Sequence, residues 1–271
     1  MKPTDPPDDA TAEGRTLISD KIPSDALVSL PLPRGTVSVT PEATADFQLA
    51  ETLGEGGMGQ VVSATQRALL RPVALKFSRD EAGRQALLRE AIATGRLEHP
   101  NIVPVHLLAT NDDGAPFFAM KRVEGTPWSS VITTRPLVEN LEVLRHVCDA
   151  LAFAHDRHIV HRDVKPSNVM LGRFGEVYLV DWALAVSLRP DAVLPMPAAD
   201  SLAGTPAYMA PEMVIDPAAI DTRTDVYLLG AVLYEVLTGR APHRAPTTEE
   251  AINAAARGDA PMFDASVPEE L

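Results

Sequence analysis

The sequence predicts an α+β protein, in which a strand-rich first part carrying one helix precedes a helix-rich second part. Short runs of β-forming residues, separated by glycine-containing turns, dominate between residues 47 and 120. Later in the chain, apolar residues recur every three or four positions, which is the helical period. Apolar residues make up 45% of the 271 positions, which is enough to fill a buried core.

Residues 1–45 differ in kind from the remainder and are expected to form a flexible, acidic leader. They hold seven of the 24 prolines and many serines and threonines. Proline lacks the backbone donor that helices and sheets need, and the segment has no sustained periodicity. We therefore expect the folded domain to span residues 46–271.

The first part of the folded domain contains two strand runs that are joined as a hairpin. Phe47–Leu49 leads into a glycine-rich turn, after which Val61–Val62 resumes the extended pattern. A further strand is expected at 73–77 and a buried one at 117–120. Between them, the spacing of apolar residues predicts an amphipathic helix over 84–97.

The second part is expected to contain two long helices and another hairpin. The apolar positions of the first helix are Leu141, Leu144, Cys148, Leu151 and His155. This stripe predicts that Cys148 is a packed core thiol. The hairpin is expected over 169–180, and residues 226–237 are apolar nearly all round, which predicts a helix buried on every side.

The overall charge limits the classes of partner that the chain can have. It holds 24 Lys and Arg against 37 Asp and Glu, a net charge of −13. This balance argues against binding nucleic acid or an anionic membrane surface, because both rely on clustered cations. The single cysteine excludes an internal disulfide, and no apolar run approaches the length of a membrane span. We expect a cytoplasmic protein, or the intracellular part of a longer, membrane-anchored one.

A glycine-rich turn is the first motif that indicates chemistry. Gly54, Gly56, Gly59 and Val61 fit the pattern G-x-G-x-x-G-x-V. Glycines let a backbone fold closely over phosphate oxygens, where a Cβ would collide. A dinucleotide-binding site shows the same triplet, but at a strand-to-helix turn. Here the glycines lie between two predicted strands, which disfavours that alternative.

A lysine and a glutamate follow this turn. Lys76 ends an apolar strand 17 residues after Gly59, and Glu90 lies on the next predicted helix. A lysine that binds phosphates needs an anionic partner to hold its ammonium group, and Glu90 can supply one. The alternatives are a surface lysine that extends to solvent and a solvated helix charge.

Three short oxygen-bearing side chains flank the second hairpin. Asp163 and Asn168 precede it, and Asp181 follows Asn168 by 13 residues. Magnesium prefers a few protein oxygens together with phosphate oxygens and water, so this sparse set suits it. Turn formation would explain any one of these residues, but it explains all three at this spacing poorly.

In their order and spacing these motifs resemble those of eukaryotic-type protein kinases, and in particular of the bacterial Ser/Thr kinases. The resemblance runs from about Phe47 to the end, some 225 residues. Beyond the residues named above, it includes the segments Glu98–Val103, Met120–Gly125, His161–Asn168, Gly204–Glu212 and Asp225–Gly230.

This resemblance implies two lobes with ATP in the cleft between them. The N-lobe would span about 46–120, an antiparallel sheet with one helix, and the C-lobe about 124–271. In the family, Glu212 pairs with an arginine that would come after residue 271, so the resemblance implies that the last helices are missing. The implied reaction transfers the ATP γ-phosphoryl group to Ser or Thr hydroxyls of protein substrates and requires Mg²⁺.

The same resemblance assigns nucleotide-binding roles. The glycines would cover the phosphates, and Lys76, fixed by Glu90, would hold the α- and β-phosphates. Met120 matches the gatekeeper, and Lys121–Val123 matches the hinge beside adenine. The implied ATP-binding positions are Leu53, Gly54, Glu55, Gly56, Gly57, Met58, Gly59, Val61, Ala74, Lys76, Met120, Lys121, Val123 and Met170.

Catalytic and metal-binding roles follow in the same way. Asn168 and Asp181 would bind magnesium. Asp163 would accept the proton of the substrate hydroxyl, and Lys165 would neutralise the γ-phosphoryl group in flight. Asp225 is expected to brace the backbone of the catalytic loop by hydrogen bonds.

Regulation is expected to involve the segment 181–212. Arg162 matches the family's docking point for a phosphorylated loop, because arginine and phosphate form a strong charge-assisted contact. Ser201 and Thr205 are the candidate autophosphorylation sites in this segment, together with the Ser/Thr-rich leader. The residue types at Thr205 and Lys165 also resemble those of Ser/Thr-directed rather than Tyr-directed members of the family.

Two other functions remain open at this point. One is a pseudokinase or nucleotide-binding scaffold weakened by a truncated C-lobe, although the residues whose loss marks that class are all present. The other is a phosphotransferase for small molecules. The segments Lys165–Pro166 and Ala210–Glu212 argue against it, because they resemble protein-substrate machinery.

Overall fold

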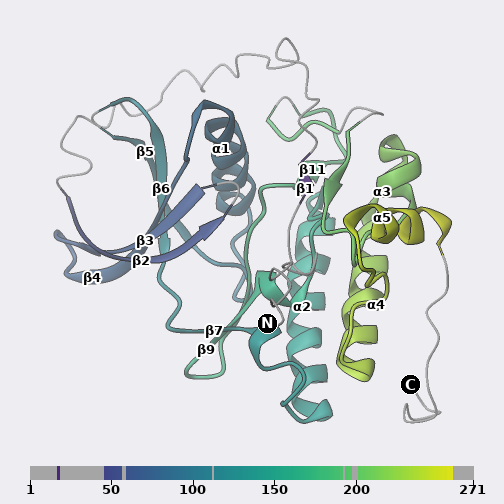
Figure 1. Cartoon of the computed structure of the whole chain (residues 1–271). Helices are drawn as coiled ribbons and strands as arrows, with labels where there is room; N and C mark the ends of the chain where they lie inside the picture. Colours follow the sequence, from purple (N-terminus) through teal and green to yellow (C-terminus); the bar gives the residue numbers. More distant parts are fainter. Residues whose placement is uncertain are drawn as a thin grey trace, which may run out of the picture.

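The computed structural model describes residues 17–18, 46–56, 59–111, 113–191, 193–196 and 201–258. A curved sheet with one helix forms one side of the molecule, and a group of helices forms the other (Figure 1). This arrangement confirms the predicted α+β fold, with an antiparallel sheet and one helix preceding a mainly helical part.

Five antiparallel strands make up the N-lobe sheet, in the order β2-β3-β4-β6-β5. Their bounds are β2 (Phe47–Gly56), β3 (Gly59–Gln66), β4 (Arg71–Phe77), β5 (Val105–Thr110) and β6 (Pro116–Lys121). The sequence did not reveal β5. It lies at the sheet edge and its residues are mostly half-buried or exposed, so its apolar pattern is weak.

The two faces of this sheet bury different side chains. Phe117 packs with Phe47 and Leu75 on one face, whereas its neighbour Phe118 packs with Leu87 of α1 on the other, as strand alternation requires. The helix α1 (Glu81–Gly95) begins after Asp80, whose carboxylate accepts the N–H of Gly83 at 2.8 Å. It therefore starts three residues before the predicted position and ends two residues earlier.

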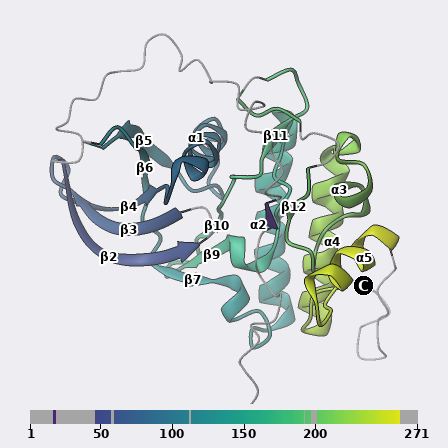
Figure 2. The ribbon, with the colours of Figure 1, turned by 45° about the horizontal axis from the view of Figure 1, so that its top comes forward.

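The C-lobe is built around two long helices, α2 (Leu137–Asp156) and α4 (Thr222–Thr238), which lie side by side (Figure 2). Asp221 and Thr224 form a reciprocal capping box at the start of α4. The helix ends at Gly239, whose φ of 74° is the left-handed conformation that glycine adopts readily. Two shorter helices, α3 (Pro211–Ile215) and α5 (Thr248–Arg257), pack together beside them.

Two predictions about burial were wrong. The core face of α2 carries Val143, Val147 and Ala154 together with the predicted Leu151, so it is rotated relative to the predicted stripe, and Cys148 is exposed. Both stripes have helical spacing, so periodicity alone did not select between them. Nor is α4 buried on every side, because the side chain of Val226 is 58% exposed.

Short strands and 3-10 turns complete the described chain. β9 (Val169–Gly172) and β10 (Val177–Leu179) form the second predicted hairpin, and β7 (Gly125–Pro127) pairs with β9. β8 (Ile159–Val160) pairs with β11 (Val186–Ser187), and β1 (Leu17–Ile18) pairs with β12 (Ala203–Gly204). The 3-10 turns are η2 (Trp128–Ser130), η3 (Pro166–Asn168) and η4 (Pro217–Ala219).

The strand β1 departs from the expected leader, which had no predicted strand. The other leader residues, 1–16 and 19–45, lie outside the described part of the chain. Among the described helices, none combines the length and the apolar character that crossing a bilayer requires.

The close pairing of β7 and β9 yields a stability prediction. A Cβ on Gly125 would collide with the backbone carbonyl oxygen of Leu171, so Gly125→Ala must displace one strand. We expect a loss of about 1–3 kcal/mol in unfolding free energy, which is typical of overpacking. Gly95→Ala is the matched control, because a Cβ there meets nothing within 4 Å. Thermal melts of both variants check this, and equal midpoints would contradict it.

Candidate active site

The register of the N-lobe sheet places four predicted nucleotide-binding residues on one face. Val61 lies opposite Lys76 across β3 and β4, and Ala74 lies opposite Met120 across β4 and β6. Directly opposed residues share a face, and so do residues two apart, such as Ala74 and Lys76. This face also carries Phe118 and is the one covered by α1.

Lys76 is held between two carboxylates. Its Nζ donates to Glu90 Oε2 at 2.6 Å and lies 3.6 Å from Asp181 Oδ1. The Lys76 and Glu90 side chains are 11% and 5% exposed, so the ion pair is largely shielded from solvent screening. The contact to Asp181 joins the two lobes, because Lys76 belongs to β4 and Asp181 follows β10.

Burial and charge shift the pKa of each member of this group. Burial acts to lower the pKa of Lys76, but the charges of Glu90 and Asp181 outweigh it and raise the pKa above its usual value. Burial raises the pKa of Glu90 to about 7 despite the neighbouring lysine. Burial also acts to raise the pKa of Asp181, but nearby positive charges, chiefly that of Lys76, lower it.

Asp225 of α4 holds the backbone of the loop that carries Asp163, as predicted. Asp225 is fully buried, and its two oxygens accept the backbone N–H groups of His161 and Arg162, each at 2.9 Å. His155 Nε2 lies 2.8 Å from the same carboxylate. Arg162 has a φ of 71°, a conformation that costs energy for a non-glycine residue and persists only where its surroundings fix it.

Asp163 lies at the centre of a polar cluster. Its Oδ1 accepts the Thr205 hydroxyl at 2.7 Å, and its Oδ2 accepts Asn168 Nδ2 at 2.9 Å. Lys165 Nζ lies 3.0 Å from Asp163 Oδ2 and donates to Thr205 Oγ1 at 2.6 Å. The cluster therefore fixes a buried carboxylate beside a lysine, the geometry that a general base next to a phosphate-neutralising cation needs.

Asn168 and Asp181 fit a hard cation. Asp181 Oδ1 is buried and, within the described ranges, accepts no hydrogen bond. Asn168 uses its amide nitrogen toward Asp163, which leaves its amide oxygen as an acceptor. The backbone links the two residues, because Val180 N–H, next to Asp181, donates to Asn168 O at 2.9 Å. An acceptor oxygen pair of this kind is suited to Mg²⁺.

The segment after Asp181 is packed tightly. Trp182 is fully buried, and its ring lies 4.5 Å from the ring of His161. Asp181 itself has a φ of 64°. Ala183, which is 6% exposed, stands where the resembled family has glycine.

The remaining predicted nucleotide-binding residues differ in their backbone constraints and in their exposure. Gly59 needs to be glycine, because a Cβ there would collide with the carbonyl oxygen of Phe77. Leu53 is exposed, whereas Lys121, Val123 and Met170 are half-buried. Gly54, Glu55 and Gly56 belong to β2, and Gly57 and Met58 lie outside the described residues.

The three predicted regulatory residues have different environments. Arg162 is buried, and its guanidinium donates to Leu184 O, while Nε and Nη2 have no partner among the described residues. Thr205 is 2% exposed and its hydroxyl is bound to Asp163 and Lys165, which argues against the prediction that it accepts a phosphate. Ser201 Oγ is buried without a hydrogen-bond partner in the described part of the chain.

Sequence reasoning missed two contacts around the site. Arg96, just after α1, pairs with Asp191 at 2.6 Å and so ties that helix to the segment that follows β11. Lys121 Nζ donates to the Tyr178 hydroxyl at 2.6 Å, which raises the lysine pKa. Both pairs join residues far apart in the chain, and no local pattern signals them.

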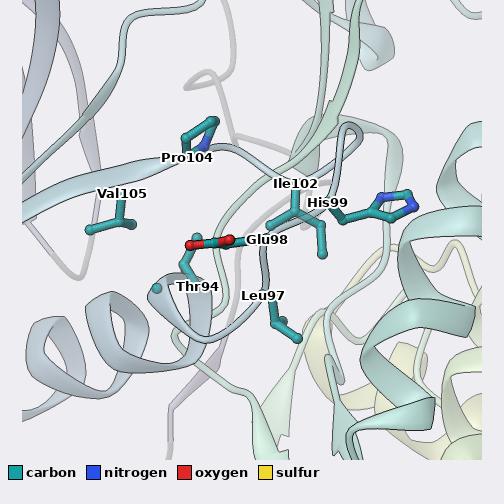
Figure 3. Close-up of a pocket in the computed structure, with 8 residues that line it drawn as sticks. Thr94, Leu97, Glu98, His99, Ile102, Pro104 and Val105 are labelled. Carbon is teal, nitrogen blue, oxygen red and sulfur yellow. The ribbon is translucent and has the colours of Figure 1, made fainter.

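A separate cavity of about 260 Å³ lies at the end of α1 (Figure 3). It is lined by residues of this helix, of the connection to β5 and of the start of β5, among them Thr94, Leu97 and Val105. None of the candidate catalytic residues lines it. The cavity is therefore not the site of the chemistry described above.

Comparisons with known proteins find related sequences over most of the chain. The family model described as "Protein kinase domain" matches residues 47–269. The chain is 32% identical over 239 residues to the serine/threonine-protein kinase PknD of Protochlamydia amoebophila, and 33% over 236 residues to PknD of Chlamydia trachomatis serovar D. It is 37% identical over 207 residues to a protein named PknB of Corynebacterium glutamicum.

These matches cover most of this chain but little of each relative. They include 75%, 73% and 72% of the chain, respectively. The chain spans only 24%, 25% and 32% of the length of these relatives.

The raised pKa of Glu90 predicts a pH-dependent site. Below pH 7 its carboxyl is increasingly protonated and holds Lys76 less well, so we expect the phosphoryl-transfer rate to fall as the pH drops from about 8 to about 6. Glu90→Gln mimics the protonated form and should give a low, flat profile. An unchanged acid limb in this variant, measured by initial rates, would contradict the assignment.

The contribution of Glu90 to the free energy of unfolding should depend on pH in the opposite direction to the transfer rate, and so decrease as the pH rises. The folded pKa of Glu90, about 7, exceeds its ordinary value of 4.5, so the folded state binds the proton more tightly than the unfolded state does. This contribution is complete below the ordinary value and is lost as the pH rises through about 7.

Proposed function

The chain belongs to the protein kinase domain family, and on this basis we propose that it transfers the γ-phosphoryl group of ATP to Ser or Thr hydroxyls of proteins. The observation that carries the proposal is the contact between the Lys76–Glu90 ion pair of the N-lobe and Asp181 of the C-lobe, with Lys76 Nζ 3.6 Å from Asp181 Oδ1. The positive charges of Lys76 and Lys165 both act to lower the pKa of Asp181. The N-lobe ion pair and the cluster around Asp163 therefore act on one site.

Each of the charged residues in the site is suited to a different role in the reaction. Asp163 is buried beside donors that hold it in place, which suits it to orient the substrate hydroxyl and accept its proton. Lys76, fixed by Glu90, holds phosphate oxygens on the N-lobe side, and Lys165 offsets charge on the transferred group. Fixed charges in a shielded site stabilise the developing charge without having to reorganise.

Asn168 and Asp181 would hold Mg²⁺, which, when bound, supplies further neutralisation of phosphate charge. Asp181 Oδ1 supports this role, because it is buried and, among the described residues, accepts no hydrogen bond, its ion-pair contact being Lys76 Nζ at 3.6 Å. The glycine-rich turn between β2 and β3 would cover the phosphates, because its backbone carries no side chain at Gly54, Gly56 and Gly59.

The preference for Ser and Thr rests on Thr205 and Lys165. Their mutual hydrogen bond and their contacts with Asp163 hold both side chains beside the proposed base. In regulation, the two guanidinium nitrogens of Arg162 that have no partner among the described residues suit a phosphate on the segment 181–212. Ser201 stays a candidate there, because its hydroxyl, although buried, is not bound to Asp163 and Lys165 as that of Thr205 is.

A transfer assay tests the proposal. The chain is incubated with radiolabelled ATP, Mg²⁺ and a generic basic protein, and the label is followed in both proteins. Transfer to serine or threonine of the added protein is the expected result. Binding of ATP without transfer would indicate a pseudokinase, and transfer only to a small molecule would indicate a different phosphotransferase.

The role of Asp163 gives a first prediction. Asp163→Asn keeps the side-chain shape but cannot accept the proton, so we expect the transfer rate to fall by about 10²–10⁴-fold. ATP binding should stay close to that of the wild type, because the contacts described for Asp163 are with residues of its own loop and with Thr205, and not with the adenine-binding face or Lys76. Asp156→Asn, at an exposed position, is the control. A rate above about a tenth of the wild-type value would exclude Asp163 as the base.

Ala183 gives a second prediction. Its Cβ restricts the backbone where the family has glycine, and the buried Trp182 before it anchors the segment. We therefore expect Ala183→Gly to bind more tightly those inhibitors that require the flipped arrangement of this segment. An inhibitor that does not require the flip is the control and should bind both proteins equally. Unchanged affinity for the first class of inhibitor would contradict the prediction.

A further inference from the structure

The ion pair between Arg96 and Asp191 connects the helix α1 with the C-lobe. Arg96 follows the last residue of α1, and its Nη1 donates to Asp191 Oδ2 at 2.6 Å. Asp191 belongs to the segment after β11, on the side of the C-lobe that faces α1 (Figure 2). The two side chains are 44% and 17% exposed, so solvent screens the pair only in part.

The carboxylate of Asp191 is held in place by its own segment. Its Oδ1 accepts the backbone N–H groups of Val193 and Leu194 at 2.8 and 3.1 Å, while its Oδ2 accepts Arg96. Burial acts to raise the pKa of Asp191, but the hydrogen bonds from Arg96 and from these backbone groups lower it. The carboxylate therefore stays charged, and the backbone donors orient it toward the helix.

The segment around Asp191 is anchored to the C-lobe on both sides. Before it, β11 pairs with β8, which leads directly into the loop that carries Asp163. After it, the side chain of Leu194 is fully buried in the core cluster that contains residues of α2 and α4, and Leu194 O accepts the N–H of Ser187 at 2.8 Å. Asp191 is therefore a fixed point of the C-lobe.

The connection that follows α1 is bound to the C-lobe as well. Asn101 Nδ2 donates to Val177 O at 3.0 Å, and Asn101 O accepts the N–H of Leu179 at 2.8 Å. These bonds hold the connection against β10. They act at a point beyond the end of the helix, so they do not by themselves fix the direction of its axis.

Arg96 supplies a second point of attachment, at the end of the helix itself. Glu90 lies six residues before Arg96 on the same chain, which is about 9 Å along a helix axis. A pivot of α1 about its end would move Glu90 away from Lys76. Two attachment points oppose such a pivot, whereas one does not.

We propose that Arg96 and Asp191 are positioning residues for phosphoryl transfer, whose ion pair fixes the direction of α1 and so keeps Glu90 against Lys76. This inference rests on the proposed kinase function. Both residues act through Glu90, whose two carboxylate oxygens accept Lys76 Nζ at 2.7 and 2.6 Å.

This contact differs in its chemistry from the one expected at Arg162. The partner of Arg96 is a carboxylate that belongs to the chain itself, whereas Arg162 is suited to a phosphate added to the segment 181–212. The position of α1 therefore does not depend on phosphorylation of that segment.

Steady-state transfer to an added basic protein tests the proposal on the full 271-residue chain. Arg96→Gln and Asp191→Asn each remove one charge, and we expect each to lower kcat about fivefold, as a partly exposed ion pair allows. Asp191→Asn keeps an acceptor oxygen for the backbone N–H groups, so the local turn is preserved. The double variant should lose no more than either single one, because the first substitution already breaks the pair.

Three controls accompany these variants. Arg96→Lys keeps the charge and a nitrogen donor, so it should keep most of the wild-type kcat. Arg84→Gln removes an arginine that pairs with Glu81 within the same helix, at 2.6 Å, and should leave kcat unchanged. Phosphatase treatment of wild type and variants before the assay should leave the ratio of their kcat values unchanged, because both partners are unmodified side chains.

A second cycle separates positioning from a general loss of stability. In the Glu90→Gln variant, Lys76 has already lost its charged partner on α1, so adding Arg96→Gln should lower kcat no further. A merely structural role of Arg96 would lower kcat by the same factor in both backgrounds.

The outcomes separate this inference from the kinase function. Provided that the wild type phosphorylates the added protein, unchanged kcat in Arg96→Gln and Asp191→Asn would overturn the inference alone. Additive losses in the double variant, an equal loss in the Glu90→Gln background, or a ratio that disappears after phosphatase treatment would do the same. Absence of transfer by the wild type would overturn both proposals.

Discussion

The buried carboxylate of Asp225 is the interaction on which the active site depends. A carboxylate without solvent contact is costly unless it is hydrogen-bonded, and Asp225 meets this need with the backbone N–H groups of His161 and Arg162. These bonds fix Arg162 in its positive-φ conformation, which turns the chain so that Asp163 faces Lys165 and Thr205. The helix α4, which contributes to the C-lobe core, thereby sets the position of Asp163, the proposed base.

A second buried charge group relates the two lobes. Lys76 reaches Glu90 within the N-lobe and Asp181 in the C-lobe, so the position of α1 is coupled to the segment that carries Asp181. The Arg96–Asp191 pair ties the end of α1 to the same stretch of chain. Movement of α1 would therefore disturb both Lys76 and Asp181.

Motifs that act through local geometry were predictable from the sequence, whereas contacts set by tertiary packing were not. The glycine-rich turn and the hairpin at 169–180 follow from residue type and spacing, and Asp225 was assigned its bracing role through the family resemblance. The core face of α2 was misjudged because two stripes share the same period and only the neighbouring α4 selects one, leaving Cys148 exposed. The pairing of β1 with β12 had no sequence signal, because two residues are too few to show alternation.

The kinetics of Asp225→Asn test the central claim most directly. The amide retains one acceptor oxygen but presents an N–H₂ group to a backbone donor, so the loop loses one of its two supports. If Asp225 positions the base, kcat falls at least tenfold while KM for ATP changes little, since the nucleotide-binding face belongs to the other lobe. Asp216→Asn, at an exposed position, should match the wild type. A wild-type kcat in the Asp225 variant, with the fold intact by thermal melt, would contradict the account.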